Sequence, residues 1–97
     1  MDKPMNTLTL TGRVAEMPAF SHDVFGEAFY QLTLAVPRLS GVNDMLPVTA
    51  SERLLELVNP QPDMLLHLEG QVRSYNKRIA EGSRLVVTLF ARSFLMQ

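Results

Sequence analysis

Apolar and polar residues alternate with a period of two along most of this chain. The pattern is clearest at residues 64–75, where one side carries Leu66, Leu68, Gly70, Val72 and Ser74 and the other carries His67, Glu69, Gln71, Arg73 and Tyr75. Alternation of this kind is typical of a β-strand that buries one face and exposes the other. We therefore predict a strand here, with Arg73 and Tyr75 at the end of its polar face.

Four other segments have the composition and alternation of strands: residues 6–14, 27–38, 45–50 and 84–96. The last of these is apolar on both faces, which predicts a central strand or one that lies in a subunit interface.

The segment SERLLELVN interrupts the strands with a helical pattern. Ser51 is a suitable N-cap, and Leu54, Leu55 and Val58 form an apolar stripe at helical spacing. The predicted fold is all-β with one short helix between the third and fourth strands. This order of elements is that of the OB-fold, a five-stranded, partly open barrel.

Two segments break the alternation, and we predict that both are loops. The first is Glu16 to Gly26, which contains Phe20 and Phe25. These two rings either fold back as a lid on the core or stay exposed to stack on bases. The second is NKRIAEGS at residues 76–83, which joins the last two strands.

The length of 97 residues suits one domain with a single core, so we expect one OB-fold domain over residues 1–97. Residues 1–4 are expected to form an extension without regular structure. The chain has no cysteine, which excludes disulfides and fits a reducing compartment such as the cytoplasm. No apolar run reaches the roughly 18 residues of a membrane span.

The net charge of −1 argues against strong nonspecific binding to nucleic acid, which depends on neutralising phosphates. The distribution of the cations matters more than their sum. Arg73, Lys77 and Arg78 fall around one predicted hairpin, and Arg13, Arg38 and Arg84 flank predicted loops. A mixed, solvated surface is the other interpretation of these charges.

Catalytic and metal-binding patterns are weak. His22 and Asp23 form a single pair in a predicted loop, and a metal needs three or four ligands. Ser51 and Ser74 have no evident base to activate them. We expect neither an enzyme nor a cofactor.

Binding of single-stranded nucleic acid needs a cationic groove and flat side chains on which bases stack. The strand phase favours Tyr75 beside Arg73, whereas Phe29 is equally compatible with a groove and with the core. The candidate binding residues are Arg13, Phe25, Phe29, Arg38, Arg73, Tyr75, Lys77, Arg78 and Arg84.

Three segments of the chain resemble bacterial and phage single-stranded DNA-binding proteins. They are N-x-L-x-L-x-G-R-V from Asn6, F-Y-x-L-x-L-A-V-x-R from Phe29, and E-G-Q-V-R-S-Y-N from Glu69. The resemblance extends in register over essentially the whole chain, and the joint order of the three segments is more specific than any one of them.

The resemblance implies an OB-fold homo-oligomer, dimeric or tetrameric, that coats single-stranded DNA in replication, repair and recombination without a cofactor. It places Arg13, Phe29, Arg73 and Tyr75 near the binding face. Because the chain stops directly after its last predicted strand, partners that family members recruit through an acidic tail are not expected. The alternative is a primosome-like OB module that binds a protein partner and touches DNA weakly.

Overall fold

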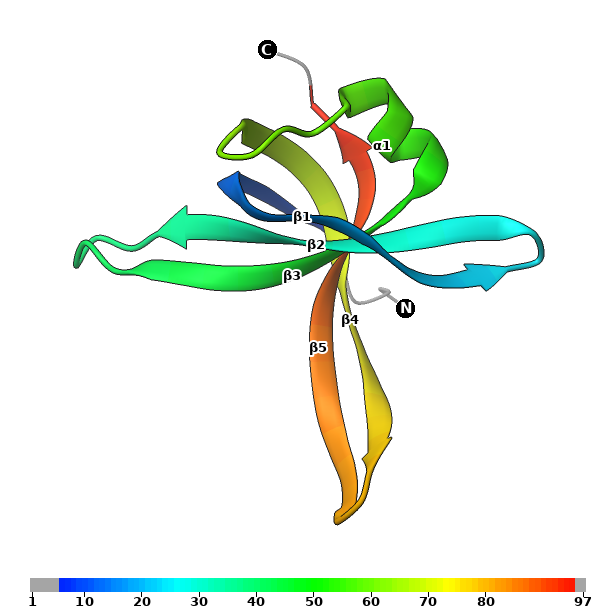
Figure 1. Cartoon of the computed structure of the whole chain (residues 1–97). Coiled ribbons are helices and arrows are strands. Elements are labelled where there is room, and N and C mark those ends of the chain that lie inside the picture. Colours follow the sequence, from blue (N-terminus) through cyan, green and yellow to red (C-terminus); the bar gives the residue numbers. More distant parts are fainter. Residues whose placement is uncertain (1–5, 96–97) are drawn as a thin grey trace, which may run out of the picture.

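The computed structural model describes residues 6–95, apart from the side chain of Tyr75, and its strands form one closed barrel (Figure 1). The predicted extension at residues 1–4 and the end of the last predicted strand at Met96 lie outside the described residues. The elements are β1 (Leu8–Val24), β2 (Glu27–Pro37), β3 (Asn43–Ser51), α1 (Glu52–Val58), β4 (Leu65–Ile79) and β5 (Gly82–Phe94).

The strands follow one another around the barrel in the order β1-β2-β3-β5-β4, and β4 pairs with β1 to close it. Strands β3 and β5 pair in parallel, and the other neighbours pair antiparallel. With the helix between the third and fourth strands, this is the predicted OB-fold.

The core is made of the inward-facing residues of several strands, as the alternation predicts. Its most deeply buried large side chains are Leu32 and Leu34 of β2, Val48 of β3 and Leu68 of β4. Burial of each such side chain contributes about 1.5–3 kcal/mol relative to leaving it exposed. The helix adds Leu55 to this cluster.

The ends of α1 are fixed by the residues that the sequence indicates. The Ser51 side chain accepts a hydrogen bond from the backbone N–H of Leu54, as an N-cap does. Asn59 takes a left-handed conformation, and its N–H donates to the carbonyl of Leu55. Pro60 follows directly, so the helix ends here.

The prediction of a loop at Glu16 to Gly26 is wrong, because β1 continues to Val24 and pairs with β2. Three register shifts, the last between Phe20 and His22, interrupt the alternation of β1. A bulge changes which face the following residues occupy, so the sequence loses its period of two although the backbone stays extended.

The loop predicted at residues 76–83 is also wrong. Strand β4 continues to Ile79 and β5 begins at Gly82, so only Ala80 and Glu81 form the turn. This part of the hairpin lies beyond the barrel and exposes both faces. Without a buried face, no apolar period marks it as a strand.

Three hairpins project from the barrel as arms: β1–β2, β2–β3 and β4–β5 (Figure 1). The β4–β5 arm leaves the barrel beyond Gly70, at a register shift between Glu69 and Gly70. A Cβ atom at Gly70 would lie 2.3 Å from the carbonyl oxygen of Phe90. Only glycine allows β5 to approach β4 this closely, so Gly70 determines where Phe90 lies.

Candidate nucleic-acid interface

Four side chains from four different strands form one continuous stack on the outside of the barrel. The rings of His22 (β1) and Phe29 (β2) are stacked, with centroids 5.2 Å apart. Phe29 then contacts Phe90 (β5) at 5.6 Å. The guanidinium of Arg73 (β4) lies 3.9 Å from the centre of the Phe90 ring. We call His22, Phe29, Phe90 and Arg73 the aromatic stack.

Strand register produces this stack. His22 and Phe29 are paired residues of β1 and β2, directly after the bulge that re-aims His22. Phe90 pairs with Gln71, two residues before Arg73 on the same face of β4. The flanking rings leave Phe29 only 8% exposed. Phe29 is therefore buried outside the core cluster, between His22 and Phe90 in the stack.

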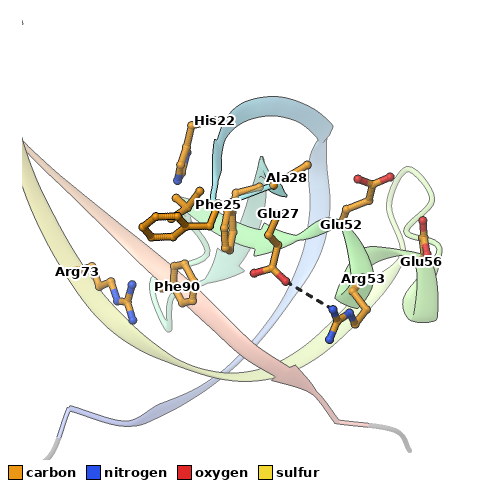
Figure 2. A pocket seen from close by; sticks show the side chains of 12 residues that line it. His22, Phe25, Glu27, Ala28, Glu52, Arg53, Glu56, Arg73 and Phe90 are labelled. Atoms are coloured by element: carbon orange, nitrogen blue, oxygen red, sulfur yellow. Dashed lines mark ion pairs between the residues drawn. The ribbon is translucent and has the colours of Figure 1, made fainter.

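An open hollow of about 820 Å³ lies over the aromatic stack. Figure 2 shows Arg73 and Phe90 at one side of it and the carboxylates of Glu52 and Glu56 at the other. Glu27 lies between the two sides, and the Arg53 guanidinium, on the same side as Glu52 and Glu56, lies 4.0 Å from its carboxylate. The hollow thus has a flat aromatic wall, a cationic end at Arg73 and a carboxylate-rich end at α1.

Phe25 lines the same hollow from the tip of the β1–β2 arm, and it is fully exposed. The interpretation of Phe25 as a lid on the core is wrong. Its backbone φ of +50°, followed by +84° at Gly26, forms a tight turn that favours Asn or Gly at both positions. A phenylalanine in this conformation costs about 1–3 kcal/mol, which usually indicates a functional reason for the residue.

Phe20 is also exposed, and its ring packs edge-on against Tyr30 with centroids 5.8 Å apart. Phe20 is therefore not a lid on the core either.

The remaining predicted cations are divided among several surfaces. Lys77 pairs with Arg84 across the β4–β5 arm, so both lie on the face that carries Arg73. Arg78 pairs with Ser83 and lies on the opposite face. The side chain of Tyr75 is outside the described part of the structure.

Arg38 and Arg13 lie away from the hollow. Arg38, at the base of the β2–β3 turn, forms an ion pair of 2.6 Å with Asp44 and a second contact through Nε at 2.8 Å. The hydrogen bond from Arg38, together with its charge, lowers the pKa of Asp44, and Asp44 in turn raises the pKa of Arg38. Arg13 donates to the backbone carbonyl of Asp63 at 3.2 Å.

The sequence did not identify two members of the aromatic stack. In the sequence, His22 is only half of a weak catalytic pair, and Phe90 falls in the segment 84–96, which is predicted to be central or in a subunit interface. Both positions depend on bulges at Phe20/His22 and at Glu69/Gly70. The signal that was available is the aromatic character of His22 close to two phenylalanines in the sequence.

The other face of the β4–β5 arm carries Arg78 and Ser83 near its tip and exposed apolar side chains closer to the barrel. Val72, Leu85 and Val87 are all exposed there, and Leu85 is 62% exposed. Next to them lies a shallow hollow of about 130 Å³, lined by Leu8, Leu10, Leu46, Pro47, Val72, Val87, Thr88 and Leu89. We call Val72, Leu85 and Val87 the apolar face, and Arg73, Lys77 and Arg84 the polar face.

Among residues 6–95, no group of three or more His, Asp or Glu side chains is placed to hold a metal ion. Within the same range, no helix has the length and apolar character needed to cross a membrane.

No protein-family model matches the chain, and no curated protein sequence matches it. Solved structures do. The dimeric N-terminal domain of the PriB protein from Thermoanaerobacter tencongensis is 41% identical, with a TM-score of 0.79 over 95% of this chain and 98% of that one.

A second similar structure is the Plasmodium falciparum SSB in complex with single-stranded DNA. Its TM-score is 0.76 over 99% of both chains, at 13% identity. That likeness reflects the shared OB-fold. Because it is 41% identical to the PriB domain over nearly the full length of both chains, the chain belongs to the PriB family of OB-fold proteins.

Proposed function

We propose that this protein binds single-stranded DNA without sequence preference along the aromatic stack and the polar face. The observation that carries the proposal is the stack itself, in which Arg73 lies 3.9 Å from the Phe90 ring beside an open hollow of about 820 Å³. Flat rings next to a fixed cation are what a base and its phosphate need. The similar structures, a PriB domain and an SSB in complex with single-stranded DNA, favour a binding protein over an enzyme.

The hollow accommodates an unpaired nucleotide in one orientation. The base stacks on the exposed edge of the aromatic stack and on Phe25, and its phosphate turns toward Arg73. The opposite orientation brings the phosphate near Glu52 and Glu56, where like charges repel. From Arg73 the strand continues over Lys77 and Arg84 on the polar face.

The candidate residues divide into two groups by their position relative to this proposed path of the DNA. Phe25, Phe29, Arg73, Lys77 and Arg84 surround the proposed path, and Tyr75 stays a candidate from the sequence alternation alone. Arg13, Arg38 and Arg78 lie elsewhere and contribute to the general field around the protein rather than to a stacked nucleotide.

We also propose that the protein works as a homodimer through the apolar face. Exposed valine and leucine side chains on a projecting arm favour burial against an equivalent surface. The dimeric PriB domain supports this assembly. Replication, repair and recombination in the cytoplasm are the processes in which such a protein would act.

The test is a fluorescence anisotropy titration of labelled oligo(dT) and of a duplex of equal length, at about 50 and 200 mM salt. We expect tight binding to the single strand, weaker binding to the duplex, and a loss of affinity at the higher salt concentration. Equal affinity for the two DNAs, or no binding to either, would contradict the proposal.

A second candidate is the primosome-like module that binds a protein partner and contacts DNA weakly. The net charge of −1 and the relationship to PriB favour it. It predicts weak binding to the oligonucleotide under both conditions, so the same titration separates the two functions.

A further inference from the structure

Helix α1 borders a second hollow besides the one over the aromatic stack. It has a volume of about 330 Å³, and most of its lining is apolar, from Met17, Pro18, Tyr30, Leu55 and Pro60. We call it the helix hollow. Its volume is at the low end of the range of about 300–1,000 Å³ that is usual for ligand pockets, which suits one or two side chains of a partner.

The apolar wall of the helix hollow is exposed and continues beyond it. Met17 is 45% exposed, and the exposed ring of Phe20 contacts Tyr30 edge-on. Tyr30 follows Phe29 on β2, and successive side chains of a strand point to opposite faces. The β1–β2 arm therefore carries an apolar surface that the proposed path of the DNA does not use.

The polar side of the helix hollow is acidic. It is formed by the exposed side chains of Glu52 and Glu56, together with the neutral Asn59. The two glutamates are four residues apart on α1, which corresponds to roughly 6 Å along the helix axis. Among residues 6–95, no lysine or arginine lines this hollow, and neither glutamate forms an ion pair.

An apolar wall beside two carboxylates selects its partner by charge. DNA and anionic lipid surfaces are repelled by Glu52 and Glu56. A second copy related by a two-fold axis would bring the same carboxylates toward one another. A basic amphipathic helix fits both parts of the surface, because lysines or arginines at positions i and i+4 also lie one turn apart, beside the apolar stripe.

We propose that the helix hollow is the docking site for a basic amphipathic helix of a partner protein. An apolar side chain of that helix enters between Met17 and Tyr30, and its cations pair with Glu52 and Glu56. The N–H of Asn59 donates to the carbonyl of Leu55 at 2.7 Å, so the end of α1 is fixed before a partner binds. A wall formed in advance lowers the cost of ordering on binding.

This docking site goes beyond the DNA binding proposed above and gives the protein partner of the second candidate function a location. The probe for it is a labelled peptide of about 18 residues, long enough to form a helix, with leucines along one stripe and lysines at i and i+4 beside it. One control peptide has glutamate in place of lysine, and another has serine in place of leucine. In an anisotropy titration without DNA, both controls should bind about tenfold more weakly.

Two matched sets of variants locate the peptide on the protein. The double variant Glu52→Gln with Glu56→Gln should weaken binding about fivefold. Glu69→Gln with Glu81→Gln removes as much charge outside the helix hollow and should change binding little.

The second set compares two exposed apolar side chains. Met17→Ser should weaken binding of the peptide about threefold, because Met17 lines the helix hollow. Phe25→Asn should leave it unchanged, because Phe25 lines only the hollow over the aromatic stack. Thermal melting confirms that each variant is folded.

Failure of the lysine–leucine peptide to bind would overturn the docking site, as would equal binding of either control peptide. Equal losses in the two double variants would overturn it as well. Equal losses in Met17→Ser and Phe25→Asn would place the peptide over the aromatic stack instead. A dimer that dissociates in Met17→Ser, measured by sedimentation velocity, would make the helix hollow an interface between two copies. Because no nucleic acid enters these measurements, the oligo(dT) titration decides the proposed DNA binding separately.

Discussion

The two faces of the β4–β5 arm differ sharply although they are formed by alternating residues of the same two strands. One face presents Arg73 beside Phe90, then Lys77 opposite Arg84. The other presents Val72, Leu85 and Val87, of which Val87 is 52% exposed. Successive side chains of a strand point to opposite sides, so one hairpin carries two independent surfaces.

The difference shows that a hairpin projecting from the barrel can present a separate binding surface on each of its faces. Within the barrel one face of each strand is committed to the core, as at Leu66 and Leu68. Toward the tip of the arm, beyond the pair of Arg73 and Thr88, neither face belongs to the core, and each can serve a different partner. The polar face suits a strand of DNA, and the apolar face suits a second copy of the chain.

The largest expected effect comes from placing a charge on the apolar face. Val87→Asp should convert the dimer to a monomer, because a two-fold interface would bury the new carboxylate twice without a partner. Sedimentation velocity measures the change. Val42→Asp, an exposed valine on the β2–β3 arm, is the matched control. If the Val87→Asp variant is still a dimer, the apolar face is not the dimer interface.

The next largest effect should come from Arg73 on the polar face. Arg73→Ala removes a charged hydrogen bond to phosphate, for which we expect a loss of about 1.5–3 kcal/mol in oligo(dT) binding. Arg92→Ala removes an exposed arginine of β5 that does not line the hollow over the aromatic stack, and it should have little effect. Comparable losses for the two variants, measured by anisotropy, would show that only overall charge matters.

Replacing Phe25 should raise the stability of the fold and lower the affinity for DNA. Phe25→Asn suits the left-handed backbone of the turn and should stabilise the fold by about 1 kcal/mol. The same change removes a stacking ring and should weaken DNA binding by about 1–3 kcal/mol.

Thermal melting and oligo(dT) titration check the two halves of the Phe25 prediction. Leu39→Asn changes an equally exposed residue on the β2–β3 arm and is the control. Retained affinity in Phe25→Asn would remove this ring from the binding path.

The smallest effect is expected at Arg38, whose charge Asp44 already neutralises. The lowered pKa of Asp44 means that the pair persists at neutral pH and is lost only as the pH falls through that lowered value. Arg38→Ala should therefore change affinity little at pH 7. Asp44→Asn should release the guanidinium and raise affinity slightly, and a large loss in Arg38→Ala would place DNA on the β2–β3 arm.

The sequence was sufficient to predict the barrel because its strands have one buried face. Leu66, Leu68 and Gly70 are buried as the alternation required, and Ser51 caps α1 as its position indicated. The predictions at Glu16 to Gly26 and at residues 76–83 were wrong. Bulges in the first segment and two exposed faces in the second remove the alternation of apolar and polar residues. Both segments were assigned to loops for this reason.

The site could be predicted only in part, for the same physical reason. Arg73 and Lys77 follow directly from the phase of β4, and the register of β5 keeps them on one face with Arg84. His22 and Phe90 join Phe29 only through bulges that set which residues meet. Local alternation carries no information about such pairings between distant segments.

The most direct test of the two-face account is a nuclear magnetic resonance titration of the isotope-labelled protein with a short oligo(dT). Signals of the polar face and the aromatic stack should shift in proportion to bound DNA, at Phe29, Arg73, Lys77 and Phe90. Signals of Val72, Leu85 and Val87 should stay where they are. Shifts that concentrate on the apolar face, or that spread equally over both faces of the arm, would contradict the account.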